Sequence, residues 1–385
     1  MLPADSSARP AAAAAALFGG AGARALQALP GRLAFSPEAA AEALGLGLIR
    51  VSAADFGSAD AAAEAIRHAA ARSGEGTLLL ISEADLFDAP AQRSAAGEAV
   101  RKALRRGRGR TLLCTLAPAA QFAAAGALPV SRSEALRLTS FAAEELHALF
   151  ARPIEEAALR RGLSAVLAAD AIRSAAAVHG RIDAALLQAW LSGRAPSFLR
   201  VLGHPVLAAR LRSLRRPGRL ALGESLRPAA ESERLAAETL VAAGLLAAEG
   251  ISDIRSRSES YFIPCDGARR LFAQALCNAL AQGRDWEGPI ECAAEALYKA
   301  DAARLSAALC GFFEALPGEP DPADAAALGF AAAGLSPSPL ADAAGFAVRL
   351  PGGLREIAFV KSAAEASAMR PGPRAAARLA VLLSE

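Results

Sequence analysis

The sequence predicts an α/β fold with a parallel-sheet domain, a helical middle region and a small α/β C-terminal region. Over residues 1–150, short apolar runs alternate with helix-length segments, which is typical of parallel strands joined by helices. From about residue 141 to residue 250, apolar residues recur at every third or fourth position, as on one face of a helix. Strand-like segments then return. We therefore expect domains over residues 1–139, 140–255 and 256–385.

Three apolar runs are the expected strands of the first domain, at residues 47–56, 77–87 and 110–118. The middle run is continuous and apolar, as expected for a strand that is covered on both faces. Helix-length segments rich in alanine and charged residues lie between the runs, over residues 58–74 and 91–107. Because helical crossovers join parallel neighbours, these strands are expected to run parallel.

The segment LFGGAGARALQAL, residues 17–29, is where a phosphate-binding loop is expected. The glycines Gly19, Gly20 and Gly22 would let the backbone approach a phosphate, and Arg24 could supply a cation. A Walker A loop also needs a lysine and a serine or threonine, and this segment has neither at the expected places. A flexible N-terminal turn is the alternative interpretation.

The run at residues 77–87 ends in acidic residues. In P-loop NTPases the terminal aspartate of this strand holds magnesium and a following acidic or polar residue aligns the attacking water. Here Ser82 stands at the aspartate position, and Glu83 and Asp85 remain as candidate catalytic residues. The alternative is a core strand that runs into an acidic helix cap.

Composition limits the classes of site that the chain can hold. The five cysteines show no CxxC spacing and the four histidines no paired spacing, so neither a disulfide framework nor a metal site is expected. The mean hydropathy of +0.28 reflects alanine rather than an apolar span, so no membrane contact is expected. A reducing cytoplasm is the expected location.

The net charge of +3 gives no bulk argument for a nucleic-acid partner, but two local runs are basic. They are solvated helix faces or weak phosphate contacts, and no aromatic residues lie between the cations to stack on bases. The first run contains Arg101, Lys102, Arg105, Arg106, Arg108 and Arg110, and the second contains Arg210, Arg212, Arg215, Arg216 and Arg219.

The C-terminal region begins with the strand-like YFIP and the amphipathic segment DGARRLFAQALCNALAQG. Near its end, FAVRL, a Pro-Gly-Gly turn and REIAFV predict a β-hairpin, and a final alanine-rich helix is expected after it.

Several segments, in order, resemble bacterial AAA-ATPase-like proteins that carry a C-terminal PD-(D/E)XK nuclease-like domain. LLLISEADLFDAP is similar to that family's Walker B strand, and RLTSFAAEELHALF to its helix after the sheet. The most specific similarity is WLSGRAPSFLRVL, residues 190–202. YFIPCDGARRLF, residues 261–272, is similar to a later strand and helix start of the family. The resemblance covers most of the chain and implies a P-loop-NTPase-like first domain.

The resemblance implies a nuclease site in which an aspartate, and a Glu-x-Lys motif on the next strand, hold a metal for phosphodiester cleavage. The matching lysine here is Lys361, but Phe359 stands where the glutamate is expected, and FAVRL lacks an acidic residue. A hard divalent cation needs several oxygen ligands, so this region is not expected to hold one.

The departures fall on catalytic residues, so the expected function is binding by a degenerate, catalytically inactive member of this family, without a bound cofactor. One alternative is a divergent ATPase that binds ATP weakly and uses Glu83, Asp85 and Arg24. Another is an assembly subunit similar to AAA+ clamp-loader subunits, which residues 131–150 and 170–189 also resemble. A helical C-terminal collar would favour the clamp-loader interpretation, and a β-hairpin packed with helices the nuclease-like one.

Overall fold

The computed structural model forms two compact units. The first contains residues 1–207, 238–244 and 251–257, and the second residues 208–237, 245–250 and 258–385. The structure describes residues 23–27, 41–42, 44–89, 92–106, 109–117, 135–136, 199–243, 245–249, 260–263, 266–317, 321–340, 344–369, 371–372 and 375–382.

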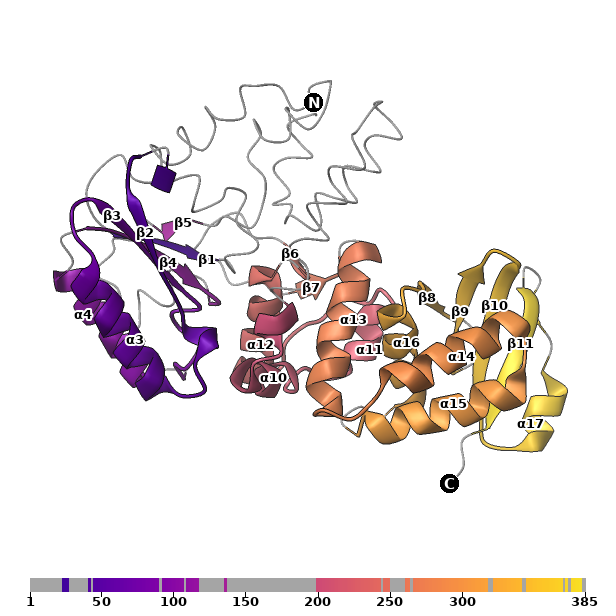
Figure 1. Ribbon diagram of the computed structural model, residues 1–385. Helices are drawn as coiled ribbons and strands as arrows, with labels where there is room; N and C mark the ends of the chain where they lie inside the picture. Colours follow the sequence, from indigo (N-terminus) through magenta and orange to yellow (C-terminus); the bar gives the residue numbers. More distant parts are fainter. Residues whose placement is uncertain are drawn as a thin grey trace, which may run out of the picture. The chain divides into compact units, whose positions relative to one another are not determined.

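A five-stranded parallel sheet forms the core of the first unit, in the order β2-β3-β4-β1-β5 (Figure 1). Its inner strand β3 is buried along nearly its whole length, because leucine and isoleucine fill both of its faces. The three predicted strands are thus confirmed as parallel neighbours. The strands are β1 (Ala23–Gln27), β2 (Gly47–Ser52), β3 (Thr77–Ser82), β4 (Arg110–Thr115) and β5 (Ala135–Leu136).

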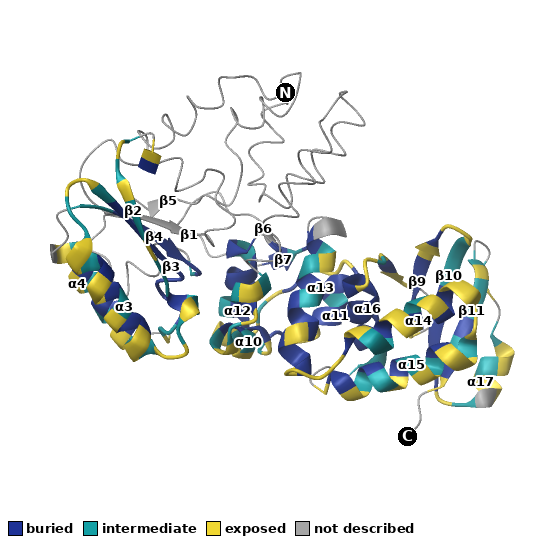
Figure 2. Cartoon of the chain, in the orientation of Figure 1, coloured by how far each residue is buried: buried dark blue, intermediate teal, exposed yellow. Residues whose placement is uncertain are grey.

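Two predicted helices, α3 (Ala59–Arg72) and α4 (Ala95–Arg106), pack side by side in the first unit (Figure 1). The hydroxyl of Ser58 caps the first turn of α3 by accepting the N–H of Ala61. Ser94 precedes α4 and accepts the N–H of Gly97. One face of each helix is buried, and the opposite face is exposed (Figure 2).

The turn predicted over residues 17–29 is wrong for residues 23–27, which form β1. This strand pairs with β4 on one side and β5 on the other, so the pairing decides its conformation against a sequence poor in strand-forming residues. The glycines Gly19, Gly20 and Gly22 lie outside the described residues.

Residues 199–207 also belong to the first unit and contact the turn that follows β2. The 3-10 turn η3 (Ala53–Asp55) follows β2, and Phe56 ends it. His204 places Nε2 3.1 Å from the carbonyl oxygen of Phe56, and its ring meets the ring of Phe87 edge-on at 5.7 Å. Residues 137–198, which carry most of the predicted helical region, lie outside the described residues.

The second unit begins with three helices and a hairpin. The helices are α10 (Pro205–Leu211), α11 (Pro217–Ala221) and α12 (Glu231–Ala242), of which α10 and α12 also have residues in the first unit. The hairpin strands are β6 (Ala247–Glu249) and β7 (Ser260–Phe262). Leu226 adds an antiparallel bridge to Tyr261 beside this hairpin. The strand-like YFIP segment is thereby confirmed over β7.

Four longer helices form the centre of this unit: α13 (Asp266–Ala281), α14 (Glu287–Lys299), α15 (Ala302–Ala315) and α16 (Pro322–Ala332). Every residue of α16 from Ala323 onward is buried, because its alanines and glycine let neighbouring helices approach closely. A Cβ on Gly329 would lie 2.6 Å from the ring of Phe312. Among the described residues, no helix has the length and apolar character that a bilayer span requires.

A mixed four-stranded sheet closes the second unit, in the order β11-β10-β9-β8. Its strands are β8 (Pro337–Pro339), β9 (Gly345–Leu350), β10 (Gly353–Val360) and β11 (Ala375–Leu382). The predicted hairpin is confirmed as β9 and β10. The expected final helix is short, α17 (Ala363–Ala368), and the alanine-rich segment after it is wrong as a helix, because it pairs with β10 as the parallel strand β11.

Candidate functional site at the carboxyl edge of the parallel sheet

Polar residues end three neighbouring strands of the parallel sheet. β2 ends at Ser52, β3 at Ser82 and β4 at Thr115, and all three are buried or half-buried. The acidic residues Glu83 and Asp85 follow β3 directly and are 1% and 5% exposed. Because ligands of open parallel sheets bind at the carboxyl ends of the strands, this edge is the candidate functional site.

Both carboxylate oxygens of Asp85 accept hydrogen bonds from the backbone just after the neighbouring strand β4. Its Oδ1 accepts the N–H of Leu116 and its Oδ2 accepts the N–H of Ala117, both at 2.8 Å. These two amides lie just past the end of β4, where the sheet ladder no longer pairs them. The carboxylate therefore joins the ends of β3 and β4, and both of its oxygens already have protein partners.

Glu83 lies in a different environment. Its backbone has a φ of 49°, in the left-handed region that glutamate rarely adopts. The hydroxyl of Ser52 donates to Glu83 Oε2 at 2.5 Å, whereas Oε1 is buried and has no hydrogen-bond partner among the described residues. One buried carboxyl oxygen thus lacks the partner that the other has.

Burial raises the pKa of Glu83 to about 7. The hydrogen bond from Ser52 and the nearby hydroxyl of Ser82 lower it in part, and the charges of Asp55 and Asp85 raise it slightly. The buried thiol of Cys114 also has a raised pKa, first because of burial and then because of the Glu83 charge. Glu83 consequently exchanges its proton near neutral pH, unlike an ordinary surface glutamate.

Sequence reasoning missed Ser52, which supplies the hydrogen bond that holds Glu83. Ser52 lay inside the strand predicted over residues 47–56, whereas in the structure β2 ends there, in register with Ser82. The polar residue directly after the apolar Val51 was a usable signal of that end.

The chain matches no protein-family model and no curated protein. Among the residues that the structure describes, no group of three or more metal-ligating side chains gathers at this edge or elsewhere.

Of the residues predicted to contact a nucleotide phosphate, Arg24 alone is described, and its backbone does not lie at this edge. Arg24 is the second residue of β1, in register with Leu112 of β4, which is in turn in register with Leu80 of β3. Glu83 follows Leu80 by three residues, so its backbone lies about 10 Å further along the strand direction. The side chain of Arg24 is not described, and its contact with a phosphate stays a prediction.

In the second unit, the predicted catalytic Lys361 is exposed in the turn after β10. Its N–H donates to Glu365 Oε2 at 2.8 Å, and Ser362 caps α17 by accepting the N–H of Glu365. Phe359, two residues earlier, is 7% exposed, and its ring lies 6.5 Å from Phe313 and 6.2 Å from Phe346. Lys361 is thus preceded by an aromatic cluster rather than by a metal-binding carboxylate.

The buried carboxylate of β10 is Glu356, and it does not join Lys361. Lys361 lies beyond the end of β10, whereas Glu356 is in the middle of the strand. Glu356 pairs with Arg378 of β11 at 2.6 Å and accepts the N–H of Gly372 at 3.0 Å. Its role is to join β10, β11 and the segment between them.

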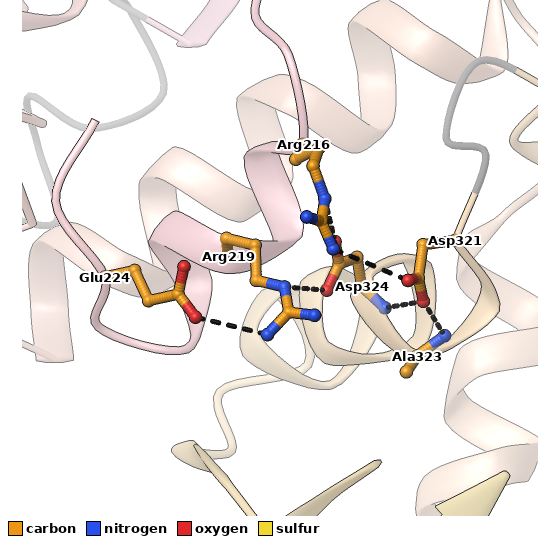
Figure 3. A network of polar contacts seen from close by, with 6 residues as sticks. All are labelled: Arg216, Arg219, Glu224, Asp321, Ala323 and Asp324. Atoms are coloured by element: carbon orange, nitrogen blue, oxygen red, sulfur yellow. Dashed lines mark hydrogen bonds and ion pairs between the residues drawn. The ribbon is translucent and has the colours of Figure 1, made fainter. Parts of the chain in front are cut away.

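Two arginines of the second run, Arg216 and Arg219, form ion pairs inside the second unit (Figure 3). Asp324, in the first turn of α16, is fully buried and lies 3.0 Å from Arg216 and 2.9 Å from Arg219. Arg216 also pairs with Asp321, and Arg219 with Glu224. Burial raises the pKa of Asp324, and the two guanidinium groups oppose that rise. These arginines hold α11 against α16 and are already neutralised.

Proposed function

We propose that this chain acts by binding, on a P-loop-NTPase-like scaffold that does not hydrolyse nucleotide and with a nuclease-like C-terminal region that does not cleave DNA. The observation that carries the proposal is the carboxylate of Asp85, whose two oxygens both accept backbone N–H groups. A magnesium ion at this edge would compete with those N–H groups for the negative charge of Asp85, and Ser82 offers no carboxylate of its own.

The scaffold half of the proposal is supported by the parallel sheet, in which β1 lies between β4 and β5 and acidic residues follow β3 at the carboxyl edge. The mixed sheet at the C-terminus, packed with helices, supports the nuclease-like interpretation over a clamp-loader-like subunit with a helical collar. Phe359 in an aromatic cluster supports the loss of cleavage.

Glu83 favours a second candidate, the divergent ATPase. A buried carboxyl group whose pKa lies near 7 has the acidity that suits a general base, and Oε1 is without a described partner. Under this alternative Glu83 would activate water while another group holds the phosphates.

Calorimetric titration with Mg²⁺-ATP and a phosphate-release assay distinguish the two candidates. We expect weak or absent binding and no release, and Ser82→Asp should not restore hydrolysis because the Ser/Thr ligand of magnesium is still missing. Submicromolar affinity that disappears in Arg24→Ala, or turnover that disappears in Glu83→Gln, would establish the ATPase instead.

The nuclease half is tested separately with supercoiled plasmid in Mg²⁺ or Mn²⁺. No nicking is expected, since Phe359 stands where the resemblance implies a glutamate and Glu356 is held by Arg378 and the N–H of Gly372. Nicking that is lost in Lys361→Ala, and kept in the exposed control Lys299→Ala, would refute this half alone.

A further inference from the structure

Exposed cations of the first arginine run identify a cationic surface on α4. In this run Arg101 pairs with Glu98, but Lys102 and Arg105 are exposed and form no ion pair with a described residue. In the second run Arg216 and Arg219 are held in ion pairs, Arg212 donates to the carbonyl oxygen of Ala279, and Arg215 is exposed. The first run therefore leaves two neighbouring cations of one helix available to a partner.

Neighbouring α3 adds two more cations of the same kind. Arg67 and Arg72 are exposed and likewise form no ion pair with a described residue. We call Arg67, Arg72, Lys102 and Arg105 the α3–α4 basic face. Sequence analysis missed the contribution of α3 because its arginines are separated from the run on α4 by a whole strand.

The fold brings the two helix ends together. Both helices lead into parallel neighbouring strands, α3 into β3 and α4 into β4, so both helices end at the amino edge of the sheet. The loops after them touch, since a Cβ on Gly109 would lie 2.4 Å from the carbonyl oxygen of Gly74. The four cations of the basic face thus lie in the second halves of two packed helices that end side by side, at the edge opposite Glu83 and Asp85.

Carboxylates do not neutralise this surface. In the second halves of the two helices and the described residues of the loops after them, Glu75 is the one acidic residue. Asp60 and Glu64 lie in the first half of α3, and Glu98 is taken by Arg93 and Arg101. Helix dipoles account for cations in a last turn, such as Arg72 and Arg105, but not for Arg67 or Lys102.

We propose that the α3–α4 basic face binds the phosphate backbone of double-stranded nucleic acid, without reading its sequence. Two packed helices present cations over a width of about 10 Å, and a duplex carries one negative charge per about 1.7 Å of its axis. Proteins that bind single strands add aromatic stacking platforms to their cations, and helices that bind lipid surfaces add buried apolar area to theirs. The large exposed apolar side chains among the described residues are Tyr298 and Leu382, both in the second unit.

This inference goes beyond the proposed function and does not depend on Glu83 or Asp85, so it holds whether or not ATP is hydrolysed. Its test is fluorescence anisotropy of the full chain with a labelled 20-base-pair duplex between 50 and 200 mM salt. Four phosphate contacts predict a log–log slope of about −3.6, which is about a 150-fold loss of affinity over that range.

Paired variants locate the contact. Lys102→Gln with Arg105→Gln, and separately Arg67→Gln with Arg72→Gln, should each reduce the slope to about −1.8. The matched control Lys299→Gln with Arg304→Gln removes two exposed cations of α14 and α15 and should leave both slope and affinity unchanged. Circular dichroism identifies a variant that fails to fold, in which case the other pair decides.

Four outcomes would overturn the proposal. These are no duplex binding at 50 mM salt, an unchanged slope in both paired variants, an equal loss in the control, and cosedimentation with phosphatidylserine vesicles in place of duplex binding. The last outcome would assign the face to an anionic membrane surface.

Discussion

Glu83 and Asp85 are two residues apart at the end of one strand, yet their surroundings give them different chemistry. Asp85 accepts two N–H groups, which stabilise its charged form. Glu83 is buried with one oxygen bonded to Ser52 and the other without a described partner, which favours its neutral form. A motif that contains both carboxylates therefore does not determine what either one does.

Replacing Asp85 should destabilise the first unit. Asp85→Ala leaves the N–H groups of Leu116 and Ala117 without their acceptors, and we expect a loss of about 3 kcal/mol in the free energy of unfolding. Asp85→Asn keeps one acceptor oxygen and should lose about half as much. Urea unfolding at a constant m-value measures this, with exposed Glu75→Ala as the control. A loss no larger than in the control would remove the structural role assigned to Asp85.

Glu83 should make stability fall as pH rises from about 4.5 to about 7. The folded state holds the proton up to a pKa of about 7, whereas the unfolded state releases it near 4.5. The stabilisation is complete below pH 4.5 and is lost by about pH 7, a change of about 3 kcal/mol. Glu83→Gln should remove this slope. Denaturation across pH 4–8 tests it, and exposed Glu64→Gln should keep the wild-type slope.

Sequence reasoning located both carboxylates at a strand end but could not assign their partners. The N–H groups that donate to Asp85 lie about 31 residues further along the chain. The hydroxyl of Ser52, which donates to Glu83, is equally distant in sequence. Only the pairing of β2, β3 and β4 brings these groups together. The burial that sets the pKa of Glu83 is likewise a tertiary property.

At the scale of elements, strands rich in leucine and isoleucine were predictable and alanine-rich strands were not. β3 and β4 each carry a short, continuous apolar run, which is typical of a buried strand. β1 and β11 consist largely of alanine with arginine and leucine, which favours a helix locally. Their parallel partners, β4 and β10, override that preference.

The contact between α11 and α16 leaves no space for a side chain at Gly218. A Cβ there would lie 2.1 Å from the carbonyl oxygen of Asp324, so Gly218→Ala should cost at least about 2 kcal/mol. Gly311→Ala is the matched control. Its Cβ would lie 3.8 Å from Pro289, so it should stabilise α15 by about 0.5–1 kcal/mol. Thermal unfolding of both variants tests this packing, and equal melting temperatures would contradict it.

At the scale of the whole molecule, the second unit includes segments that the sequence assigned to the helical middle domain. Arg212 donates to the carbonyl oxygen of Ala279, Leu226 bridges Tyr261, and Arg216 pairs with Asp324. A fragment that begins at residue 256 loses all three contacts.

Residues 208–385 should therefore fold as an isolated fragment, whereas residues 256–385 should not. The longer fragment keeps α11 against α16 and the strand partners of β7. Cooperative urea unfolding and dispersed amide resonances are expected for it alone. A shorter fragment that unfolds with equal cooperativity would place the boundary where the sequence suggested.

The hydrogen bonds of Asp85 also make it possible to measure how often the parallel sheet opens at this edge. Amides just beyond the end of a strand ordinarily exchange their hydrogens with solvent quickly, because nothing in the ladder protects them. Those of Leu116 and Ala117 donate to a buried carboxylate, so they should exchange slowly, and only when β3 and β4 separate. Deuterium uptake at these two positions would then report how often this edge opens, and a tightly bound ligand at the edge would slow it further.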